Sequence, residues 1–544
     1  MSEPINAGWA PKKPPPGGNG DEPPKPKRFW WRFVLASVLI VAVSAATTAA
    51  ATLLYLDSIA NAIQPRNPKL QERLKGFLAD GDSGGAQTFL LIGSDKRAGV
   101  EFAEDKGRSD TAMLIRLDPD KDLISMMSIP RDLKVEIPGV GTGKFNEAYF
   151  YGGTKLTLQT VKQLTGLPIN HIVNVDFLGF AQGVYAIGCV YTDVDRRYYH
   201  SNEGVPPSEQ YAEINVKPGY QLMCGKQALD YVRYRHTDTD IVRSARQQDF
   251  LSAARSRISL KDLVFDQGDL VDAFTEYTTS DISDGATLLE VLKLLAASRN
   301  ATINEVDFPA ELGPSFVYAS ESAIREAVKK FLGGQTAAEA KAEAKAEKQG
   351  KKKPKKHKKH KKKKPKVKIS RSGSDGLVPA REAGEAEAKI AARRVRGPFP
   401  IYYPTRLPEG ARFIESNPYE KVIDPYVYYV KDDDEDRHAA YRMVLISEES
   451  DGVHYFGLQG IRGWSDPPIL QDPSLTKEIH GREYEIFVDS GSVKLIAWHR
   501  GENTYWIAND LQRSLSNEQM VGMARSADVL IPKKKPRRTG RRNP

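Results

Sequence analysis

Three short segments of the chain place arginines beside carboxylates, in a pattern that suits a diphosphate. Gly107–Thr111 contains Arg108 and Asp110, Pro130-Arg131-Asp132 follows about twenty residues later, and Arg233–Gln248 holds the remaining arginines. A guanidinium presents a fixed fork of donors that matches phosphate oxygens, and carboxylates bind the divalent cation that accompanies a pyrophosphate. The segments therefore predict a site for a diphosphate with Mg²⁺ or Mn²⁺. A network of structural ion pairs is the alternative interpretation.

Most charged residues of these segments, and a few nearby residues, have a predicted role. Asp95 and Asp110 are the predicted metal ligands, and because each adjoins an apolar run, we expect them to project from neighbouring strand ends toward one point. The side chains expected to hold phosphate oxygens are Arg108, Arg131, Arg233, Arg235 and Arg243. Asp240 either orients an arginine or acts as a base. Further substrate contacts are predicted for Arg97, Lys144, Arg246 and Gln247.

Residue spacing predicts how two of these segments fold. Arg233 and Arg235 are two apart, so they share a face only on an extended chain, and we expect the helical pattern of Gln227–Arg235 to end before them. Arg243 and Gln247 are four apart and should share one face of the helix that follows.

The N-terminal part of the chain predicts a membrane anchor. An uncharged apolar run, Phe33–Leu56, follows Lys25, Lys27, Arg28 and Arg32, and it is long enough to cross a hydrocarbon core of roughly 30 Å. Positive residues stay on the cytoplasmic side, so everything after Asp57 should lie outside the cell. A cleaved signal peptide is the alternative, since Ala45–Ala51 is rich in small residues.

The remaining chain divides by composition. We expect a disordered cytoplasmic tail (1–28), a transmembrane helix (29–56), a stalk (57–87), a catalytic domain (88–333), a lysine-rich linker (334–397), an α+β domain (398–531) and a basic tail (532–544). Within 88–333, the apolar runs Phe89–Ile92, Ala112–Ile115 and Leu123–Met127 read as buried strands, and Thr154–Leu164 reads as a helix with Thr154 as its N-cap. Strands alternating with helices predict a three-layer α/β/α sandwich.

The charge of the chain resides in its lysine-rich segment. Lys341–Lys368 holds sixteen lysines and two glutamates, so its net charge of +14 exceeds the net charge of +9 of the whole chain. Such a run repels itself and binds polyanions without sequence preference. Because it should face the cell wall, a polyanionic wall polymer or anionic lipid is the expected partner and nucleic acid is not; a solvated spacer is the alternative. We expect the chemistry of Thr88–Gly333 to survive removal of this run and the domain beyond it.

Two further features concern covalent chemistry. Cys189 and Cys224 are the two cysteines, and outside the membrane we expect them to form a disulfide, with two free thiols as the alternative. Gly81–Gly85 matches the serine motif of trypsin-like proteases, but no histidine precedes Ser83, so a protease is excluded.

In order along the chain, five motifs resemble those of the LytR-CpsA-Psr cell-wall ligases. They are Gly93-Ser-Asp95-Lys-Arg97, Gly107–Thr111, Ser128–Asp132, Lys144–Tyr149 with Gly152-Gly153, and Arg233–Gln248. The similarity spans about Thr88 to Ile258. The chain departs from the family pattern in three places. Phe145 stands where the family usually has Ile, and Cys189 stands where it often has Gly. The lysine run and the last domain have no counterpart in the shortest members of the family.

The resemblance implies a membrane-anchored phosphotransferase of cell-wall assembly. Its donor would be a glycopolymer on polyprenyl pyrophosphate, such as a teichoic acid or arabinogalactan precursor, and its acceptor the C6 hydroxyl of muramic acid in peptidoglycan. Two alternatives remain at this stage: a polyprenyl-diphosphate hydrolase that uses the same site, and a non-catalytic wall-binding or regulatory anchor.

Overall fold

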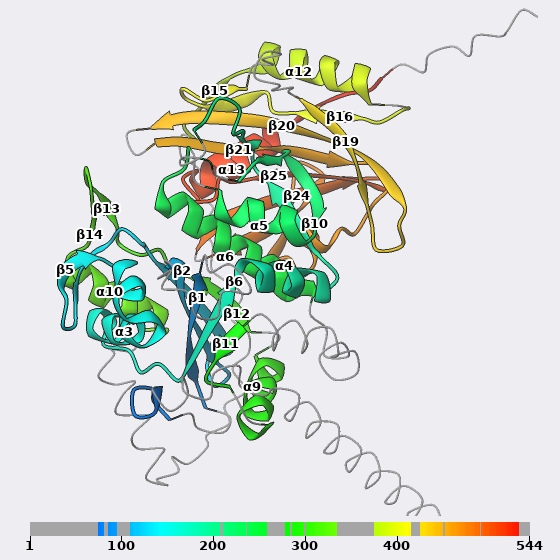
Figure 1. The fold of residues 1–544 in the computed structure, drawn as a ribbon. Coiled ribbons are helices and arrows are strands. Elements are labelled where there is room, and N and C mark those ends of the chain that lie inside the picture. Colours follow the sequence, from blue (N-terminus) through cyan, green and yellow to red (C-terminus); the bar gives the residue numbers. More distant parts are fainter. Residues whose placement is uncertain are drawn as a thin grey trace, which may run out of the picture. The chain divides into compact units, whose positions relative to one another are not determined.

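The computed structural model describes residues 74–80, 85–94, 109–206, 210, 212–234, 237–257, 278–282, 285–298, 301–334, 375–395, 397–414, 425–449, 452–489 and 491–532 (Figure 1). They all belong to one compact unit, Ile59–Pro544. The predicted tail, transmembrane helix, Gly81–Gly84, lysine run and basic C-terminus lie outside these ranges. Within them, no helix is both long and apolar enough to cross a membrane.

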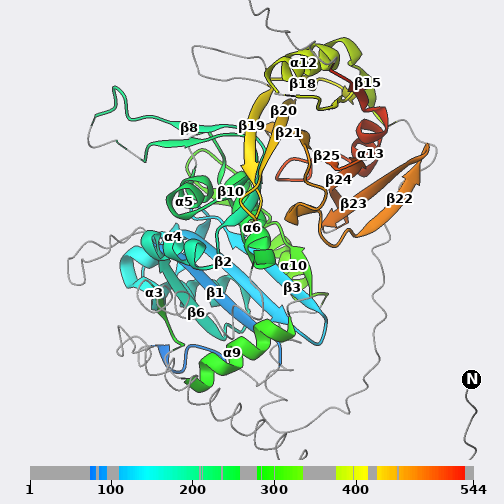
Figure 2. The same ribbon diagram turned by 90° about the vertical axis from the view of Figure 1, so that its right-hand side faces the viewer.

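A mixed six-stranded sheet forms the centre of the first part of the chain. Its strand order is β11-β6-β1-β2-β3-β12, and Figure 2 shows β6, β1, β2 and β3 side by side. The three predicted strands are confirmed, since each apolar run lies inside β1, β2 or β3. The bounds are β1 (Gln87–Ser94), β2 (Ser109–Asp118), β3 (Leu123–Ile129), β6 (His171–Asp176), β11 (Thr278–Ser280) and β12 (Thr302–Glu305).

Both faces of this sheet are apolar, because successive side chains of a strand point to opposite faces. Leu90 and Ile92 of β1 belong to the core that includes α3 (Glu147–Thr165) and α10 (Glu321–Phe331). Phe89 and Leu91 pack on the opposite core, which includes residues of α6 (Asp240–Arg257) and α9 (Gly285–Ala297).

The predicted helices are present with shifted ends. α3 begins at Glu147, seven residues before the predicted N-cap Thr154, and contains a kink at Gly153, which has φ 59°. The prediction of Thr154 as N-cap is therefore wrong: the non-helical residue of the kink is Gly153, which adopts the left-handed φ that a β-carbon disfavours. Among the described residues, this part also contains the helices α4 (Phe177–Ala186) and α5 (Gly225–Arg233).

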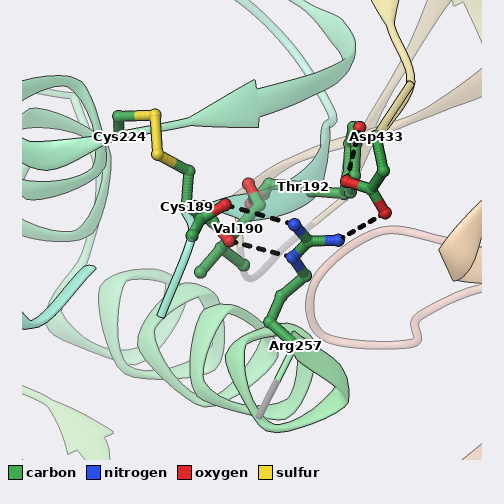
Figure 3. Close-up of a disulfide and its surroundings, with 8 residues drawn as sticks. Cys189, Val190, Thr192, Cys224, Arg257 and Asp433 are labelled. Atoms are coloured by element: carbon green, nitrogen blue, oxygen red, sulfur yellow. Dashed lines mark hydrogen bonds and ion pairs between the residues drawn. A yellow bond between two sulfur atoms is a disulfide. The ribbon is translucent and has the colours of Figure 1, made fainter. Parts of the chain in front are cut away.

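A two-stranded ribbon of β7 (Val190–Val194) and β10 (Gly219–Met223) connects α4 to α5. The predicted disulfide is confirmed: Cys189, directly before β7, is bonded to Cys224, the N-cap of α5 (Figure 3). Cys189 has φ 66°, in the left-handed region that favours glycine. Glycine is thus the natural residue for that backbone, which explains why the family pattern often has it there.

Four smaller strand pairs complete this part. They are β4 (Lys134–Ile137) with β5 (Gly141–Lys144), β8 (Tyr198–His200) with β9 (Ile214–Val216), and β13 (Glu311–Leu312) with β14 (Val317–Tyr318), besides the β7–β10 ribbon.

The C-terminal region, residues 375–532, has its own antiparallel sheet. The strand path is β18-β20-β21-β25-β24-β23-β22, with β19 paired to β20. The bounds are β18 (Arg412–Phe413), β19 (Tyr426–Lys431), β20 (Arg437–Glu449), β21 (Gly452–Ile461), β22 (Leu475–Ile479), β23 (Arg482–Asp489), β24 (Ser492–Arg500) and β25 (Asn503–Ala508).

Helices and short strands cover one side of that sheet and build a separate core. They are α12 (Arg381–Arg394), α13 (Asn517–Ser526), β15 (Leu377–Pro379), β16 (Ile401–Tyr403), β17 (Arg406–Pro408) and β26 (Asp528–Leu530). The 3-10 helix η1 (Pro468–Leu470) belongs to another cluster, in which Leu470 packs with Tyr191 and Tyr220. β15 and α12 both lie inside the predicted linker 334–397, so that range is too long. α12 buries only small residues, Ala388 and Ala391, among charged ones, and this weak apolar signal concealed it.

Candidate functional site

The ends of three neighbouring strands meet at one edge of the central sheet. β1 ends at Ser94, which pairs with Ser109 at the start of antiparallel β2, and the end of β3, Ile129, pairs with Ala112 of β2. The register is Gly93↔Thr111 and then Ser94↔Ser109, so Asp110 is the extra, unpaired residue of a β-bulge. Bulges re-aim side chains at strand ends and occur next to active sites.

This register brings together the two predicted metal ligands along the backbone. Asp95 follows Ser94 directly, and Asp110 follows Ser109, its partner across the ladder. Adjacent carboxylates at a strand edge suit a hard divalent cation by donor type. The side chains of Asp95 and Asp110 lie outside the described part of the structure, as do Arg97, Arg108 and Arg235. Among the described side chains, no group of three His, Cys, Asp or Glu gathers as a metal site.

Arg131 and Asp132 follow β3 at the same edge, and Lys144 reaches them from β5. Lys144 Nζ donates to Asp132 Oδ1 at 2.9 Å, and Arg131 Nε lies 3.3 Å from Asp132 Oδ2. Although partial burial opposes ionisation, the hydrogen bond from Lys144 and the charge of Arg131 lower the pKa of Asp132. Asp132 is therefore an anion that holds two cationic side chains at the strand edge.

Asp240, the first residue of α6, joins a second arginine to this cluster. Its Oδ2 lies 3.8 Å from Arg131 Nε, and its Oδ1 lies 3.2 Å from Arg243 Nη2. The predicted proximity of Arg131 and Arg243 is therefore present, with one carboxylate between the two guanidiniums. This position suits the orienting role predicted for Asp240, because its two carboxylate oxygens each face a different guanidinium.

Helix α6 is fastened to the sheet edge by two glutamines. Gln247 Nε2 donates to Thr111 Oγ1 at 3.0 Å and to the Val232 carbonyl at 3.1 Å, and Gln248 Nε2 donates to Ser128 Oγ at 3.3 Å. Gln247 thus contacts the residue next to Asp110. Its predicted role was a neutral contact with substrate; in this structure it connects α6 to β2 and α5.

The prediction that the chain is extended at Arg233 is wrong. α5 continues through Arg233, whose Nη2 donates to Asp230 Oδ1 at 2.8 Å one helical turn earlier. The apolar residues Tyr231 and Val232 are buried in the last turn, which explains why the helix persists. Its carboxyl end is where a cation is favoured, because the backbone carbonyls there carry partial negative charge.

Arg246 has a different place from the one predicted. Its side chain is fully buried, and its guanidinium donates to Asp238 and to the Tyr234 carbonyl while it lies over the Tyr198 ring. Arg196 binds the same carboxylate, Asp238. Burial within this ion-pair network leaves Arg246 no surface for substrate, so its predicted substrate contact is replaced by a structural one.

Sequence reasoning missed three residues that contact predicted site residues: Asp132 contacts Arg131, Thr111 contacts Gln247 and Asp230 contacts Arg233. Asp132 and Thr111 lie inside motifs that were singled out, beside residues that were selected. Asp230 precedes Arg233 by three residues on a helix, the spacing of an ion pair, and this signal would have found it.

Comparison with known proteins decides the family. A profile of the LytR_cpsA_psr family matches residues 52–344, more than half of the chain. The chain belongs to the LytR-CpsA-Psr family. Its motif residues at the sheet edge, at Lys144 and on α6 therefore lie in the family's matched part.

Several curated proteins are similar in sequence to this chain. A polyisoprenyl-teichoic acid–peptidoglycan teichoic acid transferase, TagU of Oceanobacillus iheyensis, is 30% identical over 249 residues, which cover 44% of this chain and 72% of that protein. TagT of Bacillus subtilis, of the same named activity, is 27% identical over 270 residues, covering 49% and 81%. The probable cell wall biosynthesis protein LcpB of Corynebacterium glutamicum is 31% identical over 238 residues, covering 40% and 53%.

Solved structures of the LytR-CpsA-Psr family also match this chain. TagT bound to LI-WTA has a TM-score of 0.38 and 23% identity, covering 48% of this chain and 97% of that one. The same family's YwtF (TagT) with bound octaprenyl pyrophosphate lipid has a TM-score of 0.36 and 23% identity, covering 48% and 97%.

Proposed function

We propose that this chain is a phosphotransferase that moves a glycopolymer from a polyprenyl-pyrophosphate carrier to peptidoglycan. The observation that supports this most is the run of alternating charges Lys144–Asp132–Arg131–Asp240–Arg243, assembled at a sheet edge from three separate segments. Two guanidiniums oriented by one carboxylate are suited to a diphosphate. The named activity of TagU and TagT supplies the matching substrate class.

The proposed reaction exchanges one phosphorus–oxygen bond for another. The muramic acid hydroxyl oxygen bonds to the phosphorus next to the sugar, and the bond from that phosphorus to the bridging oxygen breaks. Polyprenyl phosphate leaves, and it takes up the hydroxyl proton as a phosphate monoester. Arg131 and Arg243 hold the phosphate oxygens and stabilise the charge that develops on them. Arg108, Arg233 and Arg235 are assigned to the same task.

We include a divalent metal ion in the proposal because the carboxylates of Asp95 and Asp110 are suitable ligands for one. When bound there, Mg²⁺ or Mn²⁺ would neutralise the diphosphate and improve polyprenyl phosphate as a leaving group. Asp240 orients Arg131 and Arg243, and Lys144, fixed by Asp132, adds positive charge at the same edge.

The domain organisation and location of the chain are part of the same proposal. We assign 88–333 to the three-layer α/β/α class, because apolar cores with helices lie on both faces of its sheet. The apolar run Phe33–Leu56 is proposed as a single transmembrane helix with a cytoplasmic N-terminus, which places the catalytic residues outside the cell membrane. The lysine run Lys341–Lys368 would then face the wall, where a polyanionic polymer or anionic lipid is its proposed partner.

An in vitro transfer assay tests the function. Full-length protein in detergent is given a defined polyprenyl-pyrophosphate-linked glycopolymer, Mg²⁺ and peptidoglycan, and the products are analysed by mass spectrometry. We expect a phosphodiester between glycopolymer and peptidoglycan, together with polyprenyl phosphate. Arg131→Lys should lose most of this activity, because lysine cannot make the bidentate fork. The matched control, Arg412→Lys on the exposed surface of β18, should be unaffected.

Two other outcomes would overturn the proposal. Polyprenyl phosphate without a linkage to peptidoglycan would identify a hydrolase that uses water as acceptor. No turnover of any donor, with donor binding intact, would identify a non-catalytic anchor.

A further inference from the structure

The C-terminal region makes its contacts with the catalytic part of the chain through buried charges. Asp193, on β7, accepts two hydrogen bonds from Arg442 Nη1, both at 3.0 Å, and a third from Trp506 Nε1 at 3.0 Å. The Arg442 side chain is 1% exposed and that of Asp193 9%. Neither charge can turn to water while the contact holds, so separating the two parts would leave both ions uncompensated unless water enters.

A second carboxylate on the catalytic side is held in the same way. Asp249, in the middle of α6, lies 2.6 Å from Lys494 Nζ and 2.7 Å from Arg513 Nη2. Burial opposes its ionisation, but Arg513 and Lys494 lower the pKa of Asp249 to about 2. Arg513 also approaches Glu305 of β12, at 3.7 Å. One arginine of the C-terminal region thus joins α6 to the edge strand of the central sheet.

The end of α6 is attached to the same region. Arg257, its last residue, donates through Nη1 to Asp433 at 2.8 Å and through Nε to the Cys189 carbonyl at 3.2 Å (Figure 3). Tyr191, two residues after Cys189, donates to the Lys431 carbonyl at 3.0 Å. The disulfide segment, β7 and the end of α6 therefore meet residues of β19 and its turn.

Apolar packing accompanies these polar contacts. Tyr191 and Tyr220 of the β7–β10 ribbon share one buried cluster with Ala440, Leu495 and Trp506 of the C-terminal sheet. The backbone N–H of Tyr220 also donates to Tyr428 Oη at 2.6 Å. A mobile tethered domain would present water-exposed polar surface here, whereas this contact has the composition of a core.

The elements held in this way are those that carry the candidate site. α6 carries Arg243 and Gln247 and packs against β7, α5 and β3. β7 leads through the Cys189–Cys224 bond to the N-terminus of α5, whose last residue is Arg233. Asp249 is two residues from Gln247, which contacts Thr111 beside Asp110. Asp249 therefore lies on the same helix as the site residues Arg243 and Gln247.

We propose that the C-terminal region is a fixed brace of the transferase site, in which Lys494 and Arg513 position α6 through Asp249 while Arg442 and Trp506 position β7 through Asp193. Lys494, Arg513, Arg442 and Trp506 are positioning residues and touch no substrate. The inference rests on the proposed function for its catalytic consequence. It also reverses the sequence-based expectation that the chemistry of Thr88–Gly333 survives without the C-terminal region.

The first test needs no activity. A specific protease site is introduced between residues 335 and 374 of the full-length protein, the chain is cut, and the two fragments are passed over a sizing column in detergent. We expect the fragments to co-elute, and hydrogen exchange in α6 to stay slow. Asp249→Asn combined with Arg442→Met should release the fragments or accelerate exchange in α6, while exchange in α3 stays unchanged. If the two fragments of the cut, unsubstituted protein elute separately, the proposed brace is refuted.

The second test measures transfer by full-length variants. Asp249→Asn and Lys494→Met should lower kcat about tenfold or more with a smaller change in KM for the donor, because displacement of a positioning helix costs that much. Lys494→Arg should restore most of kcat, since it returns a cation to Asp249. Glu448→Gln, in an exposed ion pair of the same region, is the control and should change neither constant.

The outcomes separate the two proposals. Co-eluting fragments with an inactive unsubstituted protein would refute the proposed function and leave the brace supported. An active unsubstituted protein whose Asp249→Asn and Lys494→Met variants keep full kcat would refute the brace and leave the function standing. A lysine-to-arginine variant that fails to recover kcat would refute the role assigned to the charge of Lys494.

Discussion

Breaking the Arg442–Asp193 pair should cost far more stability than an ion pair on the surface. The two side chains are 1% and 9% exposed, and Trp506 adds a third donor to the same carboxylate. Arg442→Met leaves the Asp193 charge with one partner, and Asp193→Asn leaves the Arg442 charge without a counterion. Removing one partner of a buried pair costs about 3–5 kcal/mol, so we expect each single variant to lose an amount in this range.

The double variant Arg442→Met with Asp193→Asn removes both charges, and the amide that replaces the carboxylate still has an oxygen that can accept from Trp506. We therefore expect the double variant to lose about 2 kcal/mol less unfolding free energy than the two single variants lose together. Urea unfolding of full-length protein in detergent, followed by far-UV circular dichroism, gives the midpoints and slopes. Single variants that each lose less than about 1 kcal/mol, or losses that simply add, would refute the buried-pair reasoning.

Three further predictions concern pH, arginine geometry and the disulfide. Burial and the negative charge of Asp249 raise the pKa of Glu305 to about 8, so the folded protein keeps a proton that the unfolded chain releases. The free energy of unfolding should therefore fall as pH rises from about 5 to 8. Urea midpoints measured across this range should show that fall, and the Glu305→Gln variant should show less of it. The variants Arg108→Lys, Arg233→Lys and Arg235→Lys should each lose most transfer activity, because lysine cannot make the bidentate fork. Full activity of all three variants would show that only net charge matters. Replacing Cys224 by Ser should lower the unfolding free energy by about 3–4 kcal/mol, as expected for a closed loop of this length, seen as a lower Tm that reductant no longer changes.

Features that depend on neighbouring residues were predictable from the sequence. The runs at Phe89–Ile92, Ala112–Ile115 and Leu123–Met127 are strands because continuous apolar residues suit a sheet buried on both faces. The disulfide followed from cysteine count and expected location, and the grouping of Arg131 with Arg243 followed from motif order.

Local pattern failed where tertiary packing set the outcome. Spacing alone suggested that the chain is extended at Arg233, yet burial of Tyr231 and Val232 keeps it helical. The number of charges near Arg246 suggested a substrate contact, yet its guanidinium is consumed inside the protein by Asp238. In each case the outcome depends on contacts with other parts of the folded chain, and the spacing of residues within one segment does not reveal those contacts.

The motif residues and their order indicated the family and predicted diphosphate chemistry, and the apolar runs predicted the strands that carry these motifs. Only the tertiary structure decided that Asp240 stands between two arginines and that Asp193 and Asp249 are held by the C-terminal region. Asp193 and Arg442 are 249 residues apart, and each looks like an ordinary surface charge in its own segment. A buried ion pair becomes visible only when folding removes both partners from water at the same place, and no sequence pattern records that event.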